Sequence, residues 1–331
     1  MKEELVRPQA LFDTYLKLAQ EDVALFFNNA AFRRVPCPAC SGTTTQFLFR
    51  KMGFDYEECT TCGTLFVNPR PENSAFEEYY TRSASVEFWA ARFYKETEDA
   101  RRIEIIRPKA HLVKEYIEKY GKVRNNNAAV IDIGAGYGVF CEELGKIAEN
   151  AYTVLGIEPA PALQQICKQK GIRTIPKFLD EVTGSDLEGY EVTAAISFEL
   201  IEHLHDPQSF IRHCSRILPQ GCLLILTTLN WYGFDLQVLR ERSKSIHPPH
   251  HINFFTPHSL SLLLERNGFS ICDVQTPGKL DVDIVLKQPD AVSDSFIKKV
   301  LAADEPEREI FQRFLQDTHM SSHMMIVAQR S

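Results

Sequence analysis

The 331-residue sequence lacks the features that would place a protein in a membrane or on a nucleic acid. No apolar run approaches the length of about 20 residues that a membrane-spanning helix needs. The first residues include Glu3 and Glu4 and do not have the basic and apolar pattern of a secretory signal. Positive charge is also scarce, since 44 acidic residues against 37 basic ones give a formal net charge of −7, which offers a phosphate backbone no general attraction. We therefore expect a cytoplasmic protein with no membrane partner, for which nucleic acid is only a second choice.

The nine cysteines are an odd number and do not suggest a disulfide framework in a cytoplasmic chain. Four of them form two C-x-x-C pairs, Cys37 with Cys40 and Cys59 with Cys62, separated by 18 residues. This spacing is typical of a four-thiolate zinc site, in which two turns joined by a hairpin enclose one ion. A redox role for Cys37 and Cys40 lacks the thioredoxin-like βαβ context. We therefore predict a structural zinc ion, and we expect the other five cysteines to be small buried side chains.

The segment from residue 130 to residue 140 joins an apolar run to a glycine-rich turn and then to a helix-like stretch. Gly134, Gly136 and Gly138 allow the backbone to turn sharply and to approach a ligand at the helix N-terminus. The spacing G-x-G-x-G does not meet the dinucleotide pattern G-x-G-x-x-G, because Val139 stands where the third glycine would be. With Asp132 just before the turn, the segment resembles motif I of the class I S-adenosylmethionine-dependent methyltransferases.

A sulfonium nucleotide needs backbone near its amino-acid tail, an anion for its ammonium group and acceptors for its ribose hydroxyls. The turn, including Ala135, is expected to supply the first and Asp132 the second. Glu158, followed by Pro159, lies about twenty residues beyond the glycines, where a carboxylate can accept both ribose hydroxyls. An acid at this place suits NAD equally well, so an NAD oxidoreductase stays open on this residue alone.

The fourth strand-like segment carries a more specific signal. It ends at Phe198 and Glu199, which we expect to contact the cofactor, and continues into Glu202-His203-Leu204 and Asp206-Pro207. This phrase resembles the post-strand signature of the small-molecule methyltransferases that include the ubiquinone and menaquinone enzymes. The preceding four-cysteine module adds a similarity to sugar C-methyltransferases of antibiotic biosynthesis and to related enzymes of surface-polysaccharide clusters.

Strand-like and helix-like segments alternate from about residue 125 onward, which is typical of a parallel sheet with helices on both faces. We expect an α/β, Rossmann-like, seven-stranded and mostly parallel sheet, whose final antiparallel pair is implied by the resemblance. The predicted parts are an N-terminal helix in 1–34, a zinc ribbon in 35–71, a helical linker in 72–124 and a methyltransferase domain in 125–331 with inserts at about 230–257 and 277–321. We also predict a capping box of Ser74 and Glu77 at the start of the linker, a helix opened by Pro108, and a loop at residues 125–127.

Methyl transfer is an in-line displacement, so it needs alignment in a dry site and removal of a proton from the acceptor. Histidine is the natural base near neutral pH. His203 follows the fourth strand, and His250 and His251 follow the fifth, so all three are predicted at the acceptor pocket, although a structural role for His203 is an equal alternative. A second metal is disfavoured, because no carboxylate stands near these histidines at a ligand-like spacing.

The leading hypothesis is an S-adenosylmethionine-dependent methyltransferase that acts at carbon or oxygen of a small molecule, for which we expect a nucleotide-linked sugar or a related biosynthetic intermediate. The basic residues Arg240, Arg242 and Lys244 would either meet a phosphate of this acceptor or form a solvated face. The alternatives are an RNA or protein methyltransferase that reads its substrate with the zinc ribbon, and a zinc-organised scaffold without catalysis.

Overall fold

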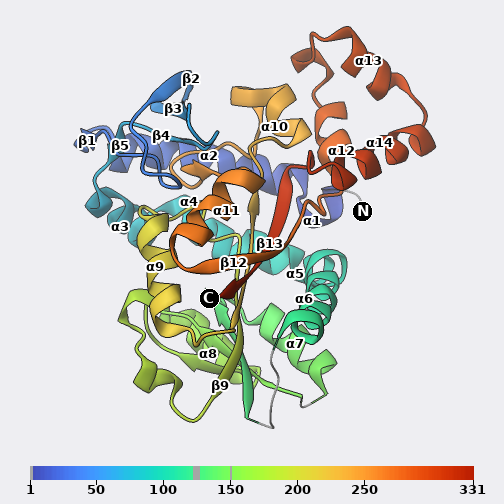
Figure 1. Ribbon diagram of the computed structural model, residues 1–331. Helices are drawn as coiled ribbons and strands as arrows, with labels where there is room; N and C mark the ends of the chain where they lie inside the picture. Colours follow the sequence, from blue (N-terminus) through green and yellow to red (C-terminus); the bar gives the residue numbers. More distant parts are fainter. Residues whose placement is uncertain (1–2, 122–126, 150) are drawn as a thin grey trace.

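The computed structural model describes residues 3–121, 127–149 and 151–331. In Figure 1, strand β9 and helices α6, α7 and α8 occupy the lower half of the view. The N-terminal helices, the small strands β1 to β5 and the helices α10, α12, α13 and α14 lie together in the upper half (Figure 1). The loop predicted at residues 125–127 falls largely outside the described residues. No described helix is long and apolar enough to pass through a lipid bilayer.

The central sheet contains seven strands in the order β12-β13-β10-β9-β6-β7-β8. They are β6 (Ala128–Ile133), β7 (Thr153–Ile157), β8 (Arg173–Ile175), β9 (Glu191–Phe198), β10 (Leu223–Leu229), β12 (Phe269–Gln275) and β13 (His323–Arg330). The pairs from β8 to β10 are parallel, whereas β13 is antiparallel to both β10 and β12. The predicted seven-stranded, mostly parallel sheet is therefore confirmed, including its final antiparallel pair.

The strand order reverses between β6 and β9, which are neighbours in the sheet. The chain moves from β6 to β7 and β8 on one side, and β9 and β10 lie on the other. In open parallel sheets, ligands bind in the crevice outside the carboxyl ends of the strands at such a reversal. The turns after β6 and β9 are therefore the two places where a site is expected.

Both faces of the sheet are covered, because alternate residues of its buried strands point to opposite sides. Val130 belongs to a core shared with α6 and α7, whereas Ile131 belongs to a core shared with α9 and α11. The helices that follow the glycine turn or lie against the sheet are α6 (Arg107–Tyr120), α7 (Val139–Ala148), α8 (Pro161–Gln169), α9 (Pro207–Ile217) and α11 (Pro257–Arg266).

The N-terminal segments form a smaller layer built around a second sheet. Its strands are β2 (Thr45–Lys51), β3 (Phe54–Cys59), β4 (Leu65–Val67) and β11 (Asn253–Phe254), while β1 (Phe32–Arg33) pairs with β5 (Arg70–Pro71). The strand β11 comes from the C-terminal half of the chain, so the ribbon shares its sheet with the segment that carries His250 and His251. The buried Arg70 strengthens this junction, since it donates to His205 O at 2.6 Å and to Asn253 Oδ1 at 2.7 Å.

The helices before the central sheet differ in detail from the prediction. They are α1 (Glu3–Val6), α2 (Gln9–Phe26), α3 (Asn73–Arg82), α4 (Ala84–Phe88) and α5 (Lys95–Arg101). The predicted capping box of Ser74 and Glu77 is wrong, because α3 begins one residue earlier, and its N-cap residue Glu72 makes no side-chain capping bond. Pro108 does not open a new helix either, since α4, α5 and α6 are joined into one helical run by π-helical turns at Trp89–Tyr94 and Arg102–Ile106. A proline in the first turn of α6 is tolerated there because the π turn before it already alters the hydrogen-bond register.

The two inserts pack on each other through their helices. They contain α10 (Phe234–Leu239), α12 (Asp281–Leu286), α13 (Ser295–Ala302) and α14 (Glu305–Asp317). Their shared core includes Phe234, Leu239, Val285 and Leu315. The basic residues that follow α10 do not converge on a site, because Arg240 and Arg242 are exposed and Lys244 pairs with Asp13 at 2.7 Å.

Candidate active site

The glycine turn connects the buried strand β6 to helix α7, as the sequence predicted. Gly134, Gly136 and Gly138 all have positive φ angles, of 81°, 54° and 70°. A Cβ added at Gly138 would lie 2.4 Å from Ile172 Cδ1, so glycine is needed there for packing. A Cβ at Gly136 would meet only Gly134 O, at 4.0 Å, and would otherwise enter open space. The turn thus forms a cradle that a larger side chain would fill, which suits the close approach of a cofactor tail.

Glu158 follows β7 and faces this turn from the neighbouring strand. Its Oε2 accepts the N–H of Gly136 at 2.9 Å, and its Oε1 accepts the N–H of Ala160 at 2.9 Å. Burial raises the pKa of Glu158, although these two backbone donors oppose the shift. Each carboxylate oxygen keeps a lone pair that can accept a hydroxyl donor. The carboxylate is therefore held beside the glycine turn. Its remaining lone pairs can accept the two hydroxyls of a ribose. Pro159 follows it, and its carbonyl accepts Gln164 Nε2 at 2.9 Å.

Asp132 lies within β6, one strand residue before the turn, and is only 4% exposed. Among the described residues, the single hydrogen-bond partner of the Asp132 carboxyl group is the thiol of Cys141, at 3.4 Å. Burial raises the pKa of Asp132 to about 7. The carboxyl group therefore titrates near neutral pH, and a nearby ammonium group would favour its charged form.

The affinity for S-adenosylmethionine should rise between about pH 6 and about pH 8 if Asp132 receives the ammonium group, because the carboxyl ionises over this interval. Isothermal calorimetry across this range measures the effect, and Asp132→Asn should flatten the curve, whereas the exposed Asp317→Asn should not. In the unliganded protein the same raised pKa makes this group's contribution to stability fall from about pH 4 to about pH 7, since the folded carboxyl holds its proton more tightly than the unfolded one. A pH-independent affinity in the wild-type protein would contradict this role.

The turn after β9 is held by ionic contacts. Glu199 has a positive φ of 50° and accepts Lys109 Nζ at 2.9 Å, Thr227 Oγ1 at 2.6 Å and His323 Nε2 at 3.2 Å. Although burial opposes ionisation, the charges of His323 and Lys109 hold the pKa of Glu199 well below its usual range. Phe198 directly precedes Glu199, and its ring lies 4.8 Å from the ring of Phe140 on helix α7. The predicted contact residues Phe198 and Glu199 thus border the crevice, with Glu199 already engaged by protein partners.

The three predicted histidines come together, although 47 residues separate His203 from His250. Their ring centroids lie 4.3 Å apart, and that of His251 lies 4.8 Å from His203. His247 joins them, with its ring 4.2 Å from His251. Burial is the main cause that lowers the pKa values of all four, to about 3 for His251, and for His247, His250 and His251 the positive charges that neighbouring rings would carry add to it. The cluster is therefore neutral near pH 7 and offers lone pairs for accepting a proton or binding a metal.

Glu202 is a member of this cluster that the sequence reasoning missed. Its side chain, that of His203 and that of His251 offer potential metal-ligand atoms within 4.8 Å of one another. Burial and the charge of Glu199 raise the pKa of Glu202 to about 8. The expectation that no carboxylate stands near the histidines is therefore wrong, because the turn after β9 brings Glu202 to them although residues 247–251 have no carboxylate at a ligand-like spacing. The motif Glu202-His203 was the available signal, since adjacent residues of a tight turn can both face one crevice.

Tyrosine side chains from the N-terminal helices cover the histidines. The ring of Tyr15, on α2, lies 5.5 Å from His247, and that of Tyr80, on α3, lies 5.7 Å from His250. In the part of the chain that the structure describes, Tyr15 Oη, Tyr80 Oη, His247 Nε2 and His250 Nδ1 are buried without a hydrogen-bond partner. Buried polar atoms nearly always have partners in folded proteins. Their concentration here indicates a place where a polar ligand binds.

Two arginines lie among the N-terminal segments, Arg7 over the ring of Phe12 and Arg101 over that of Tyr94. Arg101, on α5, makes one long hydrogen bond to Val6 O at 3.4 Å, and its Nε is buried without a partner among the described residues. Burial lowers the pKa of Arg101, and the positive charge of Arg7 lowers it further. The negative charges of Tyr94 and Glu199 act in the opposite direction. The charge of Arg7 also acts on His251. A buried guanidinium group without a carboxylate partner is suited to an anionic group of a ligand.

The four predicted cysteines form a compact cluster. Cys37 Sγ lies 3.5 Å from Cys62 Sγ, and Cys40 Sγ lies 3.5 Å from Cys59 Sγ. The hairpin of β2 and β3 connects the two pairs, as predicted. The sulfurs converge on one point and receive second contacts, from Gly42 N to Cys40 at 3.3 Å and from Thr64 Oγ1 to Cys62 at 3.2 Å. Four convergent thiol groups with such supporting contacts fit a tetrahedral zinc ion.

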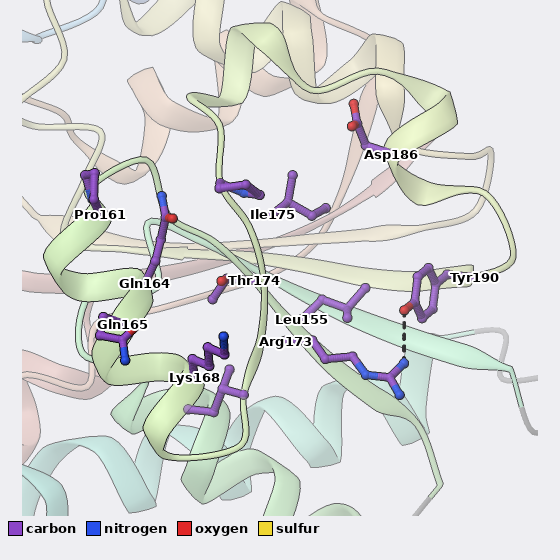
Figure 2. Close-up of a pocket in the computed structure, with 12 residues that line it drawn as sticks. Leu155, Pro161, Gln164, Gln165, Lys168, Arg173, Thr174, Ile175, Asp186 and Tyr190 are labelled. Atoms are coloured by element: carbon purple, nitrogen blue, oxygen red, sulfur yellow. Dashed lines mark hydrogen bonds between the residues drawn. The ribbon is translucent and has the colours of Figure 1, made fainter.

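A separate groove of about 680 Å³ runs beside the edge strand β8. Figure 2 shows Gln164, Gln165 and Lys168 on α8 at one side of it and Asp186 and Tyr190 at the other, with Arg173 donating to Tyr190 Oη at 3.2 Å. None of the predicted site residues lines this groove. The candidate active site is instead the region of the turns after β6 and β9, where the strand order reverses.

The strand order, the glycine turn and the acid after β7 define a cofactor-binding α/β fold of the class I type. A family model described as a methyltransferase domain matches residues 103–274, more than half of the chain. The chain therefore belongs to the methyltransferase domain family. The resemblance to class I S-adenosylmethionine-dependent methyltransferases is thereby confirmed, and the predicted four-cysteine cluster is present.

Curated relatives agree with this family. The chain is 28% identical over 158 residues to the mitochondrial ubiquinone biosynthesis O-methyltransferase of Homo sapiens, covering 43% of this chain and 41% of that protein. It is 30% identical over 165 residues to the ubiquinone biosynthesis O-methyltransferase of Xanthomonas oryzae pv. oryzae, covering 44% of this chain and 64% of that protein. The match thus spans less than two thirds of these relatives. Among solved structures, an S-adenosylmethionine-dependent methyltransferase from Mesorhizobium loti is 15% identical and aligns with 67% of this chain and 96% of its own at a TM-score of 0.42.

Proposed function

We propose that the protein transfers a methyl group from S-adenosylmethionine to a small-molecule acceptor. The observation that carries this proposal is the pairing of the glycine turn after β6 with Glu158 after β7, joined by the bond from Gly136 N to Glu158 Oε2 at 2.9 Å. The two features meet at the reversal of strand order, where a nucleotide cofactor binds in folds of this type. Membership of the methyltransferase domain family selects the sulfonium nucleotide over NAD.

In this proposal the residues of the crevice hold and orient the cofactor. S-adenosylmethionine, when bound, supplies an activated methyl group on a positively charged sulfur. The backbone of residues 134–138 lies along the amino-acid tail, Asp132 receives the ammonium group and Glu158 accepts the ribose hydroxyls. Phe198 and Glu199 border the same crevice from β9. Fixing the donor in this way leaves alignment with the acceptor as the main source of acceleration.

The acceptor is proposed to bind between the histidine cluster and the N-terminal helices. Its hydroxyl or activated carbon must lose a proton, and the neutral imidazoles of His203, His250 and His251 are the nearby groups able to take one. The unpartnered hydroxyls of Tyr15 and Tyr80 can hydrogen-bond polar groups of the same molecule.

The proposed acceptor is a nucleotide-linked sugar or a related anionic intermediate. Arg101 supports this class, because its buried Nε has no hydrogen-bond partner and it has no carboxylate partner in the described part of the chain, and the charge of Arg7 acts on His251. The curated relatives are named as O-methyltransferases of ubiquinone biosynthesis, and this supports a hydroxyl as the methylated group. For the cysteine cluster we propose a structural zinc ion that holds the ribbon against the acceptor pocket.

The proposal is tested first by cofactor binding. Glu158→Gln should weaken S-adenosylmethionine binding by about tenfold to a hundredfold, because a hydrogen bond to a charged acceptor contributes about 1.5–3 kcal/mol. Calorimetric titration measures this loss, and the exposed Glu188→Gln is the matched control. Binding of NAD in place of S-adenosylmethionine, or equal affinity in both variants, would show that the crevice has a different ligand.

The chemical step is tested by replacing His203, His250 and His251 singly with alanine. Labelled S-adenosylmethionine is incubated with candidate acceptors, and products are followed by mass spectrometry. At least one replacement should slow turnover by about a hundredfold or more, since general base catalysis contributes roughly 10²–10⁴. The exposed His258→Ala is the control. If all three variants kept turnover within about tenfold of wild type, proton removal by His203, His250 or His251 would be excluded.

A further inference from the structure

We propose that Glu202, His203 and His251 bind a divalent transition-metal ion beside the acceptor pocket. Their potential ligand atoms lie within 4.8 Å of one another, so one ion can reach all three. Two histidines and one carboxylate are a common ligand set for zinc and for non-haem iron, and they leave coordination positions open for a substrate or water. The site is distinct from the cysteine cluster, whose four sulfurs close their own site.

The orientation of the two imidazoles supports metal binding. His203 Nδ1 lies 2.8 Å from His250 O, and His251 Nδ1 lies 2.6 Å from Ser245 O. A carbonyl oxygen only accepts hydrogen bonds, so Nδ1 carries the hydrogen in each ring and Nε2 keeps the lone pair. Metal-binding histidines typically donate their other N–H to a carbonyl or carboxylate in this manner, because it fixes both ring orientation and tautomer.

The carboxylate is held in the same way. Glu202 Oε2 accepts the hydroxyl of Thr228 at 2.8 Å, which leaves the second oxygen for a cation. The backbone of Glu202 is also tied to the loop that carries His251, because Ile252 N and Asn253 N donate to Glu202 O at 3.0 Å and 3.1 Å. The three ligands therefore belong to one rigid unit, although their segments are far apart in the sequence. Such preorganisation lowers the cost of assembling a metal site.

The location gives the ion a function, and this part rests on the proposed methyl transfer. An acceptor hydroxyl that bound an open coordination position would have its pKa lowered by the cation. His203 and His251 would then act as ligands and not as bases, and the hydroxyl proton would pass to water. The deprotonated oxygen forms a bond to the methyl carbon as the carbon–sulfur bond breaks and the sulfonium becomes a neutral sulfide.

The test is metal stoichiometry of the full chain, measured without cofactor or acceptor. The protein is stripped with a chelator and titrated with Co²⁺, whose thiolate-bound form is identified by sulfur-to-metal charge-transfer absorption. We expect two ions per wild-type chain, of which the second binds without that absorption. His251→Ala and Glu202→Gln should weaken the second ion at least about a hundredfold, since even supporting contacts of a metal change affinity 10- to 100-fold. His258→Ala should keep both ions.

Folding and the cofactor site are monitored on the same variants. Thermal unfolding and S-adenosylmethionine binding should stay close to wild type, which separates loss of the metal from loss of the fold or of the proposed function. A single ion per wild-type chain with thiolate absorption, or a second ion that persists in His251→Ala and Glu202→Gln, would overturn the proposal. If the protein bound the second metal ion but not S-adenosylmethionine, the metal site would be supported and the proposed methyl transfer would be refuted.

Discussion

Replacement of Cys37 and Cys62 together by serine should remove the proposed zinc ion and abolish the proposed acceptor turnover. These two sulfurs lie 3.5 Å apart and come from different C-x-x-C pairs, so neither half of the site stays complete. Structural zinc contributes about 10–16 kcal/mol to the folding of isolated zinc-finger peptides. We therefore expect the ribbon to lose its fixed structure and the thermal unfolding temperature to fall.

The loss of turnover follows from what the ribbon holds. The hydroxyl of Tyr56, on β3, donates to His251 O at 2.7 Å, and β4 pairs with β11 directly after that histidine. An unfolded ribbon would thus release the loop that carries His250 and His251. Turnover should fall by at least about a hundredfold, the order of the contribution of a positioned general base.

Zinc content by elemental analysis, thermal unfolding and product formation check this result. Cys272→Ser is the matched control, because Cys272 belongs to the edge strand β12 and packs against a different core from the one that contains Cys37, Cys59 and Cys62. One zinc ion per chain in the double variant, or turnover close to wild type after zinc loss, would contradict the structural role.

Substitution of Gly136 by valine should abolish binding of S-adenosylmethionine. The φ angle of 54° is disfavoured for a β-branched residue, at a cost of about 1–3 kcal/mol. The added side chain would meet little protein, because only Gly134 O lies as near as 4.0 Å to its Cβ, so it would occupy the space proposed for the cofactor tail. The N–H that Gly136 donates to Glu158 would also be displaced by any relaxation of the turn.

Calorimetry should therefore find binding weakened by more than about a hundredfold, equivalent to roughly 3 kcal/mol or more. The control is Gly145→Ala, since Gly145 lies in helix α7, where a Cβ meets nothing within 4 Å. This change should be neutral or stabilise the helix by about 0.5–1 kcal/mol. Unchanged affinity in Gly136→Val would show that the cofactor does not approach this turn.

The local elements of the central sheet followed from the sequence. Buried parallel strands read as short apolar runs, so the alternation of strand-like and helix-like segments from about residue 125 predicted a mostly parallel sheet, which the structure has. The cysteine pairs were equally clear, because a four-thiolate site needs two short pairs and a hairpin between them. The start of α3 and the start of α6 could not be predicted from the sequence. The missing N-cap bond of α3 and the π turns before α6 depend on packing and not on a residue pattern.

What the sequence by itself determined is the resemblance to the family, the alternation of strands and helices, and the places of the glycine turn, the acid after the next strand and the cysteine pairs, because each depends on residues close together in the chain. Only the tertiary structure decided that β11 completes the ribbon sheet, that Tyr15 and Tyr80 cover the histidines, and that Glu202 joins His203 and His251. These contacts join segments separated by dozens to hundreds of residues. These contacts form only when the layers pack together, and the spacing of residues along the sequence does not predict how they pack.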